Sequence, residues 1–173
     1  MVTLRPARDA DVPELQRVER DADARFADAG HPELADGSGI PDEVARGAIA
    51  QGRITVAEVD GAVIGWAYVG RVGGELCLGQ ISVTPAHGGV GVGTALLRRV
   101  IDEARRAGEG SIVLNTQSDV AWNRPWYERR GFVVVPRAAW SEALLAVERD
   151  QARHGLDWST RVHMRLTLGA PGN

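Results

Sequence analysis

The spacing of apolar residues changes several times along the chain, and each change marks an expected element. Apolar residues three to four positions apart, as on one face of a helix, occupy residues 12–22, 92–104 and 140–154. Shorter helices are expected over residues 42–50 and 125–130. Compact or alternating apolar runs, typical of strands, lie at residues 2–5, 54–59, 63–72, 76–83, 111–115, 132–135 and 160–168. The pattern therefore predicts an α/β protein.

The turns between the strands predict how the sheet is connected. Asp60-Gly61 joins two apolar runs as a two-residue hairpin, and Gly73-Gly74 leads into a third, so these strands should form an antiparallel meander. The helix over residues 92–104 leads to the strand over residues 111–115, and such a path normally makes a right-handed parallel crossover. We therefore expect a mixed, mostly antiparallel central sheet with one parallel pair and flanking helices.

Two local features of the N-terminal third complete this prediction. Asp11 or Asp9 can cap the helix over residues 12–22. Residues 26–41 are rich in turn formers and lack a clear period, so we expect a mobile surface loop there.

Composition narrows the class of protein. With 173 residues, 44% of them hydrophobic, the chain is expected to form a single domain over residues 1–173. A net charge of −3 gives no support for binding to nucleic acid. The one cysteine, Cys77, and four scattered histidines form neither a disulfide nor a zinc pattern, which favours the cytoplasm and argues against a metal site. No stretch approaches the ~18 apolar residues of a membrane span, so no membrane partner is expected.

The glycine-rich segment 88–93 lies between an expected strand and an expected helix. A helix start has unpaired backbone N–H groups and the positive end of the dipole, and glycines allow a diphosphate to approach them. Two nucleotide motifs are excluded, because Gly93 stands where a P-loop needs lysine and Leu96 where a dinucleotide fingerprint needs glycine. The alternative is that these glycines only form a tight turn.

At this junction the sequence resembles the GCN5-related N-acetyltransferase (GNAT) family, whose acyl-CoA motif is Gln/Arg-x-x-Gly-x-Gly/Ala. Residues 88–93 are GGVGVG, so Gly88 replaces the usual Gln or Arg. A second segment, residues 122–132, is similar to the family's Tyr-x-x-x-Gly-Phe pattern, beginning at Tyr127. The order of expected elements agrees with the family over most of the chain.

The resemblance implies the GNAT acyl-CoA N-acyltransferase fold, with acetyl-CoA as cofactor. Its parallel pair is splayed between the strands at residues 81–83 and 111–115, and the pantetheine arm pairs with the freed backbone groups. N–H groups near Ile81 and Val83 would face the thioester oxygen. The cofactor-binding residues implied are Ile81, Ser82, Val83, Gly88, Gly89, Val90, Gly91, Val92, Gly93, Thr94, Asn115 and Asn123. Asn123 has the alternative of capping the short helix that follows.

Two residues are candidates for proton transfer. The resemblance implies Tyr127 as the general acid beside the departing thiolate; the alternative is a core aromatic with a hydrogen-bonded hydroxyl. Many relatives carry a glutamate on the strand over residues 76–83, where this chain has none at the inner positions. Glu75, at the start of that strand, is the candidate base, and a solvated strand end is the alternative. Gln80 and Ser82 could instead hold a water molecule.

These features predict an N-acetyltransferase that moves the acetyl group directly to a primary amine of a small molecule or peptide. By resemblance, residues 31–41 wall the acceptor site, where Glu33 and Asp36 either attract a cationic amine or are simply solvated. A non-catalytic CoA-binding sensor is the alternative, because Gly88 and the missing carboxylate depart from the family pattern. The C-terminal helix and final strand could pair two copies in a homodimer.

Overall fold

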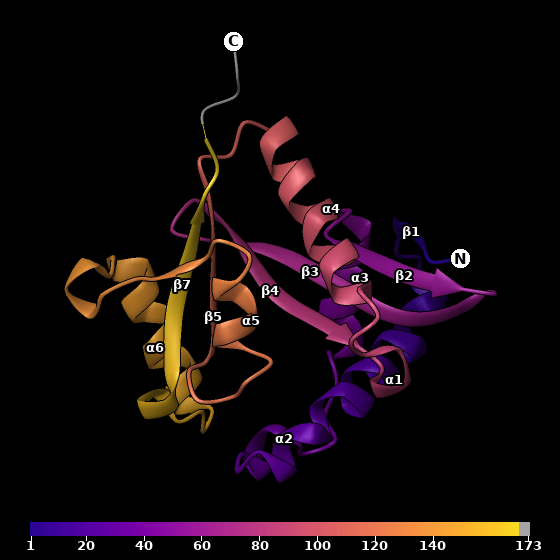
Figure 1. Ribbon diagram of the computed structural model, residues 1–173, viewed down its shortest axis with the longest axis horizontal. Helices are drawn as coiled ribbons and strands as arrows, with labels where there is room; N and C mark the ends of the chain where they lie inside the picture. The colour runs from indigo at the N-terminus through magenta and orange to yellow at the C-terminus, as the bar shows by residue number, and fades with distance from the viewer. Residues whose placement is uncertain (170–173) are drawn as a thin grey trace. The chain divides into compact units, whose positions relative to one another are not determined.

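The computed structural model describes residues 1–169, which form a mixed α/β fold (Figure 1). The strands are β1 (Thr3–Pro6), β2 (Ile54–Val59), β3 (Ala62–Val72), β4 (Glu75–Val83), β5 (Ser111–Gln117), β6 (Val133–Val134) and β7 (Arg161–Thr167). The α-helices are α1 (Val12–Asp23), α2 (Arg25–Asp28), α3 (Asp42–Ala50), α4 (Val92–Arg106), α5 (Arg124–Glu128) and α6 (Glu142–Arg153).

The strands hydrogen-bond in the order β1-β2-β3-β4-β5-β7-β6. Their pairing is antiparallel except between β4 and β5, which confirms the expected mixed sheet. The parallel ladder covers only Leu76 opposite Ile112 and Cys77 opposite Val113, although both strands continue beyond these residues. Such a short ladder agrees with a splayed pair.

The chain is divided into two compact units, and strands β3 and β4 each contribute residues to both. The first consists of Met1–Val69 and Gln80–Val100, and the second of Gly70–Gly79 and the chain from Ile101 onward. The single domain over residues 1–173 stays a prediction.

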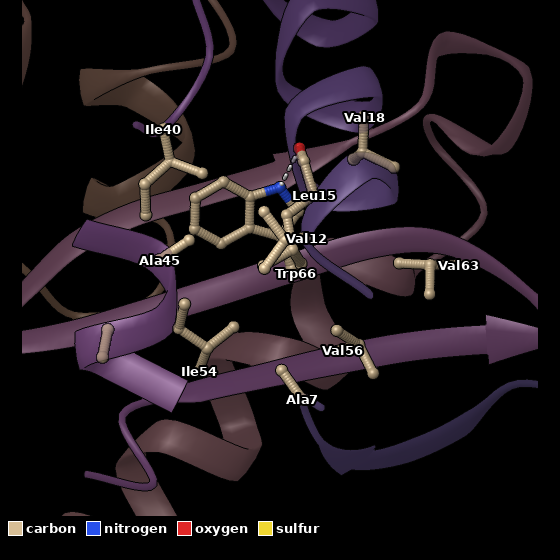
Figure 2. Close-up of a cluster of buried hydrophobic side chains, with 11 residues drawn as sticks. Ala7, Val12, Leu15, Val18, Ile40, Ala45, Ile54, Val56, Val63 and Trp66 are labelled. Carbon is tan, nitrogen blue, oxygen red and sulfur yellow. Dashed lines mark hydrogen bonds between the residues drawn. The ribbon is translucent and has the colours of Figure 1, made fainter. Parts of the chain in front are cut away.

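The core of the first unit lies between helices α1 and α3 and strands β2 and β3. The indole of Trp66 is 1% exposed, and its Nε1–H donates to the carbonyl oxygen of Leu15 at 2.9 Å, as Figure 2 shows. The apolar spacing predicted for α1 brings Val12, Leu15 and Val18 to this face. One face of the β2–β3 hairpin is therefore covered by two helices.

The hairpin between β2 and β3 follows the predicted turn. Asp60 and Gly61 have φ angles of 50° and 82°, the left-handed pair that a two-residue turn of this type requires. The expected strands on either side are confirmed within one residue, and α3 has the predicted bounds.

The second unit contains β5 and β7 paired along their whole length, with β7 beside β5 in yellow in Figure 1. Leu144 of α6 packs with Val113 and Val135, and Trp140 covers the same cluster. Helix α6 begins at Glu142 rather than Trp140 because the Ser141 hydroxyl caps it, accepting from the Leu144 N–H at 3.4 Å.

The expectation of a surface loop over residues 26–41 is wrong in part. His31 and Ile40 are only 6% and 8% exposed, and the Ile40 N–H donates to the Glu19 carboxylate at 2.6 Å. A Cβ at Gly39 would lie 3.0 Å from the Gln16 Cα, so the segment packs closely on α1. Irregular backbone has no period, and its burial therefore leaves no pattern in the sequence.

The expected cap by Asp11 is also wrong, since its side chain makes no capping hydrogen bond to α1. The Asp11 carboxylate instead accepts two hydrogen bonds from the Arg5 guanidinium, at 2.7 and 2.9 Å, and a third from the Arg8 N–H. A charged donor from β1 thus outcompetes the helix amides. The strand expected at residues 132–135 is shortened to β6, because the Phe132 N–H donates to the Tyr127 carbonyl oxygen.

Candidate active site

The glycine turn lies between β4 and α4 in the first unit. Its start is fixed by backbone hydrogen bonds, from the Thr84 N–H to the Ile64 carbonyl and from the His87 N–H to the Thr84 carbonyl, both at 2.9 Å. The Thr84 hydroxyl and His87 Nδ1 lie 3.0 Å apart. The strand end therefore holds the turn in one orientation before the chain reaches Gly88.

Gly89 and Gly91 have φ angles of 77° and 95°, which other residues adopt only with strain. A Cβ built on either would meet no atom within 4 Å, so the space over the turn is open. Gly88 has an ordinary φ of −69°, but a Cβ there would lie 3.2 Å from the Pro85 carbonyl oxygen. The Gln or Arg usual in the family would therefore be crowded at this position.

Helix α4 begins at Val92, directly after the glycine turn. At its start the Ala95 N–H donates to the Gly91 carbonyl at 2.9 Å. The N–H groups of Val92 and Gly93 precede it, where a helix supplies no acceptor. Together with the helix dipole, these donors favour an anionic ligand.

Close packing against β3 and β4 fixes the position of α4. Gly65 alternates with Trp66 and so faces the opposite side of the strand. A Cβ at Gly65 would lie 3.0 Å from the Ser82 carbonyl oxygen and 3.3 Å from the Leu96 Cδ1 atom. Only glycine lets the helix approach the strands this closely.

We expect Gly65→Ala to lower the free energy of unfolding by about 1–3 kcal/mol, because a methyl group there overpacks backbone and helix together. Gly47→Ala is the matched control, since Gly47 lies inside α3 with open space around it and should gain up to about 1 kcal/mol. Urea unfolding measures both. Equal effects in the two variants would show that the packing at Gly65 is unimportant.

The other cofactor candidates of the first unit belong to the same strand, turn and helix. Ser82 is 3% exposed, and its hydroxyl accepts from the Gln80 amide at 2.9 Å. Ile81 and Val83, on either side of it, are half-buried. Their contact with a cofactor stays a prediction, as it does for Gly88, Gly89, Val90, Gly91, Val92, Gly93 and Thr94.

Tyr127 lies in α5 of the second unit and is 8% exposed. Its ring packs edge-on against Trp126 and Phe132, with centroid distances of 4.9 and 5.5 Å. Burial raises the pKa of the Tyr127 phenol, so that it keeps its proton throughout the physiological range. The phenol therefore has a proton to donate, but its raised pKa makes it a weaker acid than an ordinary tyrosine.

Asn123 precedes α5, and its carbonyl oxygen accepts from the N–H groups of Trp126 and Tyr127 at 2.8 and 3.1 Å. Its side chain makes no capping hydrogen bond, so the capping alternative is wrong. Cofactor binding by the Asn123 amide stays a prediction.

Glu75, the candidate base, lies at the start of β4 within an ion pair. Its two carboxylate oxygens accept from Nε and Nη2 of Arg165, each at 2.7 Å, and the Ser111 hydroxyl donates to it at 2.7 Å. The guanidinium and the hydroxyl lower the pKa of Glu75. Catalysis by Glu75 stays a prediction, and the ion pair opposes it because both oxygens are engaged and a lowered pKa makes a weaker base.

We expect Glu75→Gln to lower the free energy of unfolding by about 1–3 kcal/mol, because it breaks a bidentate, partly buried pair. This stabilisation requires the ionised carboxylate, so it is present at neutral pH and is lost as the pH falls below about 4.5. The exposed Glu142, 3.7 Å from Arg149, is the control, and Glu142→Gln should cost under about 0.5 kcal/mol. If Glu75→Gln instead removed turnover while stability was kept, Glu75 would be the base.

Acidic residues gather where α1 meets the segment after it. Burial raises the pKa of Asp23 to about 7, with repulsion from Glu19 and Asp36 as smaller causes. Of the two residues expected to attract an amine, Glu33 lies 3.2 Å from His31 Nδ1, and Asp36 accepts from the Ser38 N–H at 2.8 Å. Both carboxylates therefore have partners within their own loop.

The raised pKa of Asp23 predicts a pH-dependent stability. Between about pH 4 and 7 the folded protein keeps a proton that the unfolded chain has lost, so this group lowers the free energy of unfolding by at most about 1.4 kcal/mol per pH unit. We expect Asp23→Asn to be about 1–2 kcal/mol more stable than the wild type at pH 8 and equal to it near pH 4. Urea unfolding across this range checks the difference, which would be independent of pH if Asp23 were ionised in the fold.

Asn115 and Arg161 meet in the second unit. The Asn115 side-chain oxygen accepts from both Nε and Nη2 of Arg161, which lies at the first residue of β7. No local pattern marks Arg161, because its burial depends on a strand 46 positions away in the sequence. Cofactor binding by Asn115 stays a prediction.

The described residues also bear on three other kinds of chemistry: a reactive thiol, a metal site and a membrane span. Burial raises the pKa of the Cys77 thiol to about 11, so it is protonated at neutral pH and is not activated as a nucleophile. Within residues 1–169, no three histidine, cysteine, aspartate or glutamate side chains are arranged to hold a metal ion. Over the same residues, no helix is both long and apolar enough to cross a membrane.

The chain matches the family described as "Acetyltransferase (GNAT) family" over residues 17–132. This segment contains the glycine turn, α4 and the Tyr127 region, and it represents more than half of the chain.

Solved structures with similar folds come from several organisms. An N-acetylglutamate synthase from Neisseria gonorrhoeae, complexed with coenzyme A and N-acetyl-glutamate, has a TM-score of 0.71 and 20% identity; the match covers 97% of this chain but only 35% of that one. The ribosomal-protein-S18-alanine N-acetyltransferase of Escherichia coli has a TM-score of 0.69 and 19% identity, covering 100% and 97%. The PaiA N-acetyltransferase of Thermoplasma acidophilum, complexed with coenzyme A, has a TM-score of 0.70 and 14% identity, covering 97% and 99%.

Proposed function

Because the chain belongs to the acetyltransferase (GNAT) family, we propose that it transfers an acetyl group directly from acetyl-CoA to a primary amine of a small molecule or peptide. The observation that carries this proposal is the glycine turn before α4. Gly89 and Gly91 have positive φ angles with open space above them, and they lead directly into the first turn of α4, where the N–H groups of a helix lack helical acceptors. Similar folds crystallised with coenzyme A support the choice of cofactor.

The residues of the turn fit the diphosphate of coenzyme A. A diphosphate offers several anionic acceptors, and the turn offers backbone N–H donors next to two glycines that carry no side chain. We propose that the backbone from Gly89 to Thr94 holds it. Gly88 contributes backbone alone, which leaves the affinity dependent on N–H groups rather than on a charged side chain.

When bound, acetyl-CoA supplies an acetyl group activated as a thioester. We propose that N–H groups near Ile81 and Val83 stabilise the negative charge that develops on the carbonyl oxygen during attack. Asn115 and Asn123 are proposed to bind the pantetheine or CoA amides.

Tyr127 is proposed as the general acid. It holds a proton on its phenolic oxygen at neutral pH, because burial raises its pKa. The thiol of coenzyme A has an ordinary pKa of about 8.5, below that of the phenol, so the phenol would stabilise the departing thiolate as a hydrogen-bond donor while the carbon–sulfur bond lengthens, and the proton released by the amine would complete the neutralisation.

Removal of a proton from the amine is proposed to proceed through water. Glu75 is paired with Arg165, whereas the Gln80 amide and Ser82 hydroxyl are hydrogen-bonded to each other at 2.9 Å and could orient a water molecule. An ordinary alkylamine with a pKa of about 10.4 costs about 4.6 kcal/mol to deprotonate at pH 7. A water relay to solvent supplies that step without a dedicated carboxylate.

A non-catalytic sensor of coenzyme A is the second candidate function. It is favoured by two observations, the glycine at position 88 and the engagement of Glu75 by Arg165. A sensor needs the glycine turn and requires no acid or base.

Steady-state release of free thiol from acetyl-CoA, measured with a panel of primary amines, tests the two functions. Amine-dependent thiol release supports the transferase. Calorimetric binding of coenzyme A without amine-dependent release supports the sensor. Failure to bind coenzyme A or its thioesters at all would contradict both.

A further inference from the structure

Arg161 is a partly buried cation in the second unit that has no carboxylate partner. Its hydrogen bonds are those from Nε and Nη2 to Asn115, a neutral amide. Among residues 1–169, no aspartate or glutamate oxygen lies within 4.0 Å of its guanidinium. Burying a charge without an opposite charge is costly, so this arrangement needs a reason.

Two other partly buried arginines, Arg165 and Arg5, are paired with carboxylates. Arg165, four positions further along β7, holds Glu75 in a bidentate pair. Arg5 binds both Asp11 and Glu58. Arg161 and Arg165 thus lie on the same strand, but only Arg165 has a carboxylate partner.

The charge on Arg161 persists at neutral pH. Burial lowers its pKa to about 10, and no nearby carboxylate offsets this effect. His163, two residues along β7, has a pKa lowered by burial and is uncharged at neutral pH. Arg161 is therefore charged at neutral pH, and the carboxylate that acts on His163, that of Glu148, is paired with Arg137.

Asn115 occupies only part of the guanidinium. Arginine has five N–H groups, and the bonds to Asn115 use the Nε–H and one Nη2–H. The edge formed by Nη1 and the other Nη2–H is the pair of donors that matches a carboxylate bidentately. Asn115 holds the side chain in position while this edge keeps its donors.

A second donor in the same cluster also lacks an acceptor. The indole of Trp158 lies 5.8 Å from the Arg161 Cζ atom and 4.7 Å from the ring of His163. Its Nε1–H is buried and has no hydrogen-bond partner in residues 1–169. Buried indole N–H groups are normally bonded, so the cluster lacks acceptors as well as negative charge.

We propose that Arg161, positioned by Asn115 and flanked by Trp158, binds the carboxylate of the acetyl acceptor, which makes the acceptor an amine of the amino-acid class. This inference rests on the proposed transferase function for its link to the reaction. It supplies a chemical class of acceptor, since a carboxylate brings the acceptor oxygens and the single negative charge that the cluster lacks. Arg161 would act as a binding residue and takes no part in proton transfer.

Matched pairs of amines test the proposal by thiol release from acetyl-CoA. The pairs are L-glutamate with 4-aminobutyrate, L-phenylalanine with 2-phenylethylamine, and L-lysine with cadaverine, each differing by the α-carboxylate. We expect the wild type to favour the amino acid of at least one pair. Arg161→Gln should raise the KM for that amino acid about tenfold to 100-fold, as expected for a lost charged hydrogen-bond pair, with the KM for the decarboxylated amine changed less than twofold.

Three further variants separate recognition from packing. Arg161→Lys keeps the charge without the planar edge and should recover part of the lost affinity. Trp158→Phe removes the indole N–H and keeps an aromatic side chain, so it takes the place of Arg161→Gln as the test if that variant fails to fold. Arg137→Gln is the control, because Arg137 lies over Trp140 at 4.5 Å but is paired with Glu148, and this variant should leave KM unchanged.

A binding measurement separates failure of this inference from failure of the proposed function. The N-acetyl derivatives of the same amino acids are titrated against tryptophan fluorescence, with saturable quenching expected in the wild type and lost in Arg161→Gln. Turnover of amines without preference for the carboxylate would overturn the proposal while keeping the transferase. If Arg161→Gln shifted the Kd for coenzyme A and left the KM for the amino acid unchanged, the proposal would also be overturned. The same holds if the protein turned over no amine and the N-acetyl amino acids gave no saturable quenching.

Discussion

Replacing Gly89 and Gly91 together by alanine should raise the Kd for coenzyme A about 100-fold, equivalent to about 2.7 kcal/mol. Both glycines have positive φ angles, and the space over each is open. Two methyl groups would project into the space proposed for the diphosphate and would also strain the turn that presents the N–H groups. Isothermal titration calorimetry with coenzyme A measures this loss.

A second pair of glycines provides a matched control. Gly108 and Gly155 follow α4 and α6 with φ angles of 74° and 92°, and a Cβ on either also meets nothing within 4 Å. The double alanine variant at these positions carries similar backbone strain, about 1 kcal/mol per site, without touching the turn. It should leave the Kd within twofold. Equal losses in both double variants would mean that strain, and not access to the turn, governs binding.

Replacing Tyr127 by phenylalanine should lower kcat about 100-fold, the ordinary contribution of a positioned general acid. The variant removes the phenolic proton and keeps the ring between Trp126 and Phe132, so the fold and the KM for acetyl-CoA should change little. Initial rates of thiol release across pH, together with a melting curve, measure these effects.

Tyr68, the other tyrosine of the chain, is the control for Tyr127. It lies in β3 and packs beside the core of the first unit. Tyr68→Phe should keep kcat within twofold. If Tyr127→Phe also kept kcat, the phenol would be a core group, and the thiolate would leave without its help.

The elements of this fold could be predicted where local rules decide them. The Asp60-Gly61 turn fixes its hairpin because two left-handed residues permit few other conformations. Helix α3 and the apolar face of α1 follow from spacing alone. The turn before α4 belongs to the same class, since glycines are needed where φ is positive.

The remaining features depend on partners distant in the sequence. Asp11 could not be recognised as an Arg5 partner, because β1 and the helix start meet only in the folded chain. Glu75 looks like a strand end in sequence, yet Arg165 lies 90 positions away. Arg161 becomes unusual only once the fold shows that no carboxylate of residues 1–169 pairs with its guanidinium. The spacing of apolar residues therefore cannot predict which charged side chains pair with one another in the folded chain.

The two-residue strand β6 at the end of the sheet has a consequence for behaviour at high concentration. Exposed sheet edges recruit strands from other molecules, and a long apolar edge promotes fibre growth. Here the edge strand comprises Val133 and Val134, and it offers few backbone groups to an incoming chain. Val133 is 63% exposed, but β6 has only two residues, so this strand is a poor template for amyloid-like stacking.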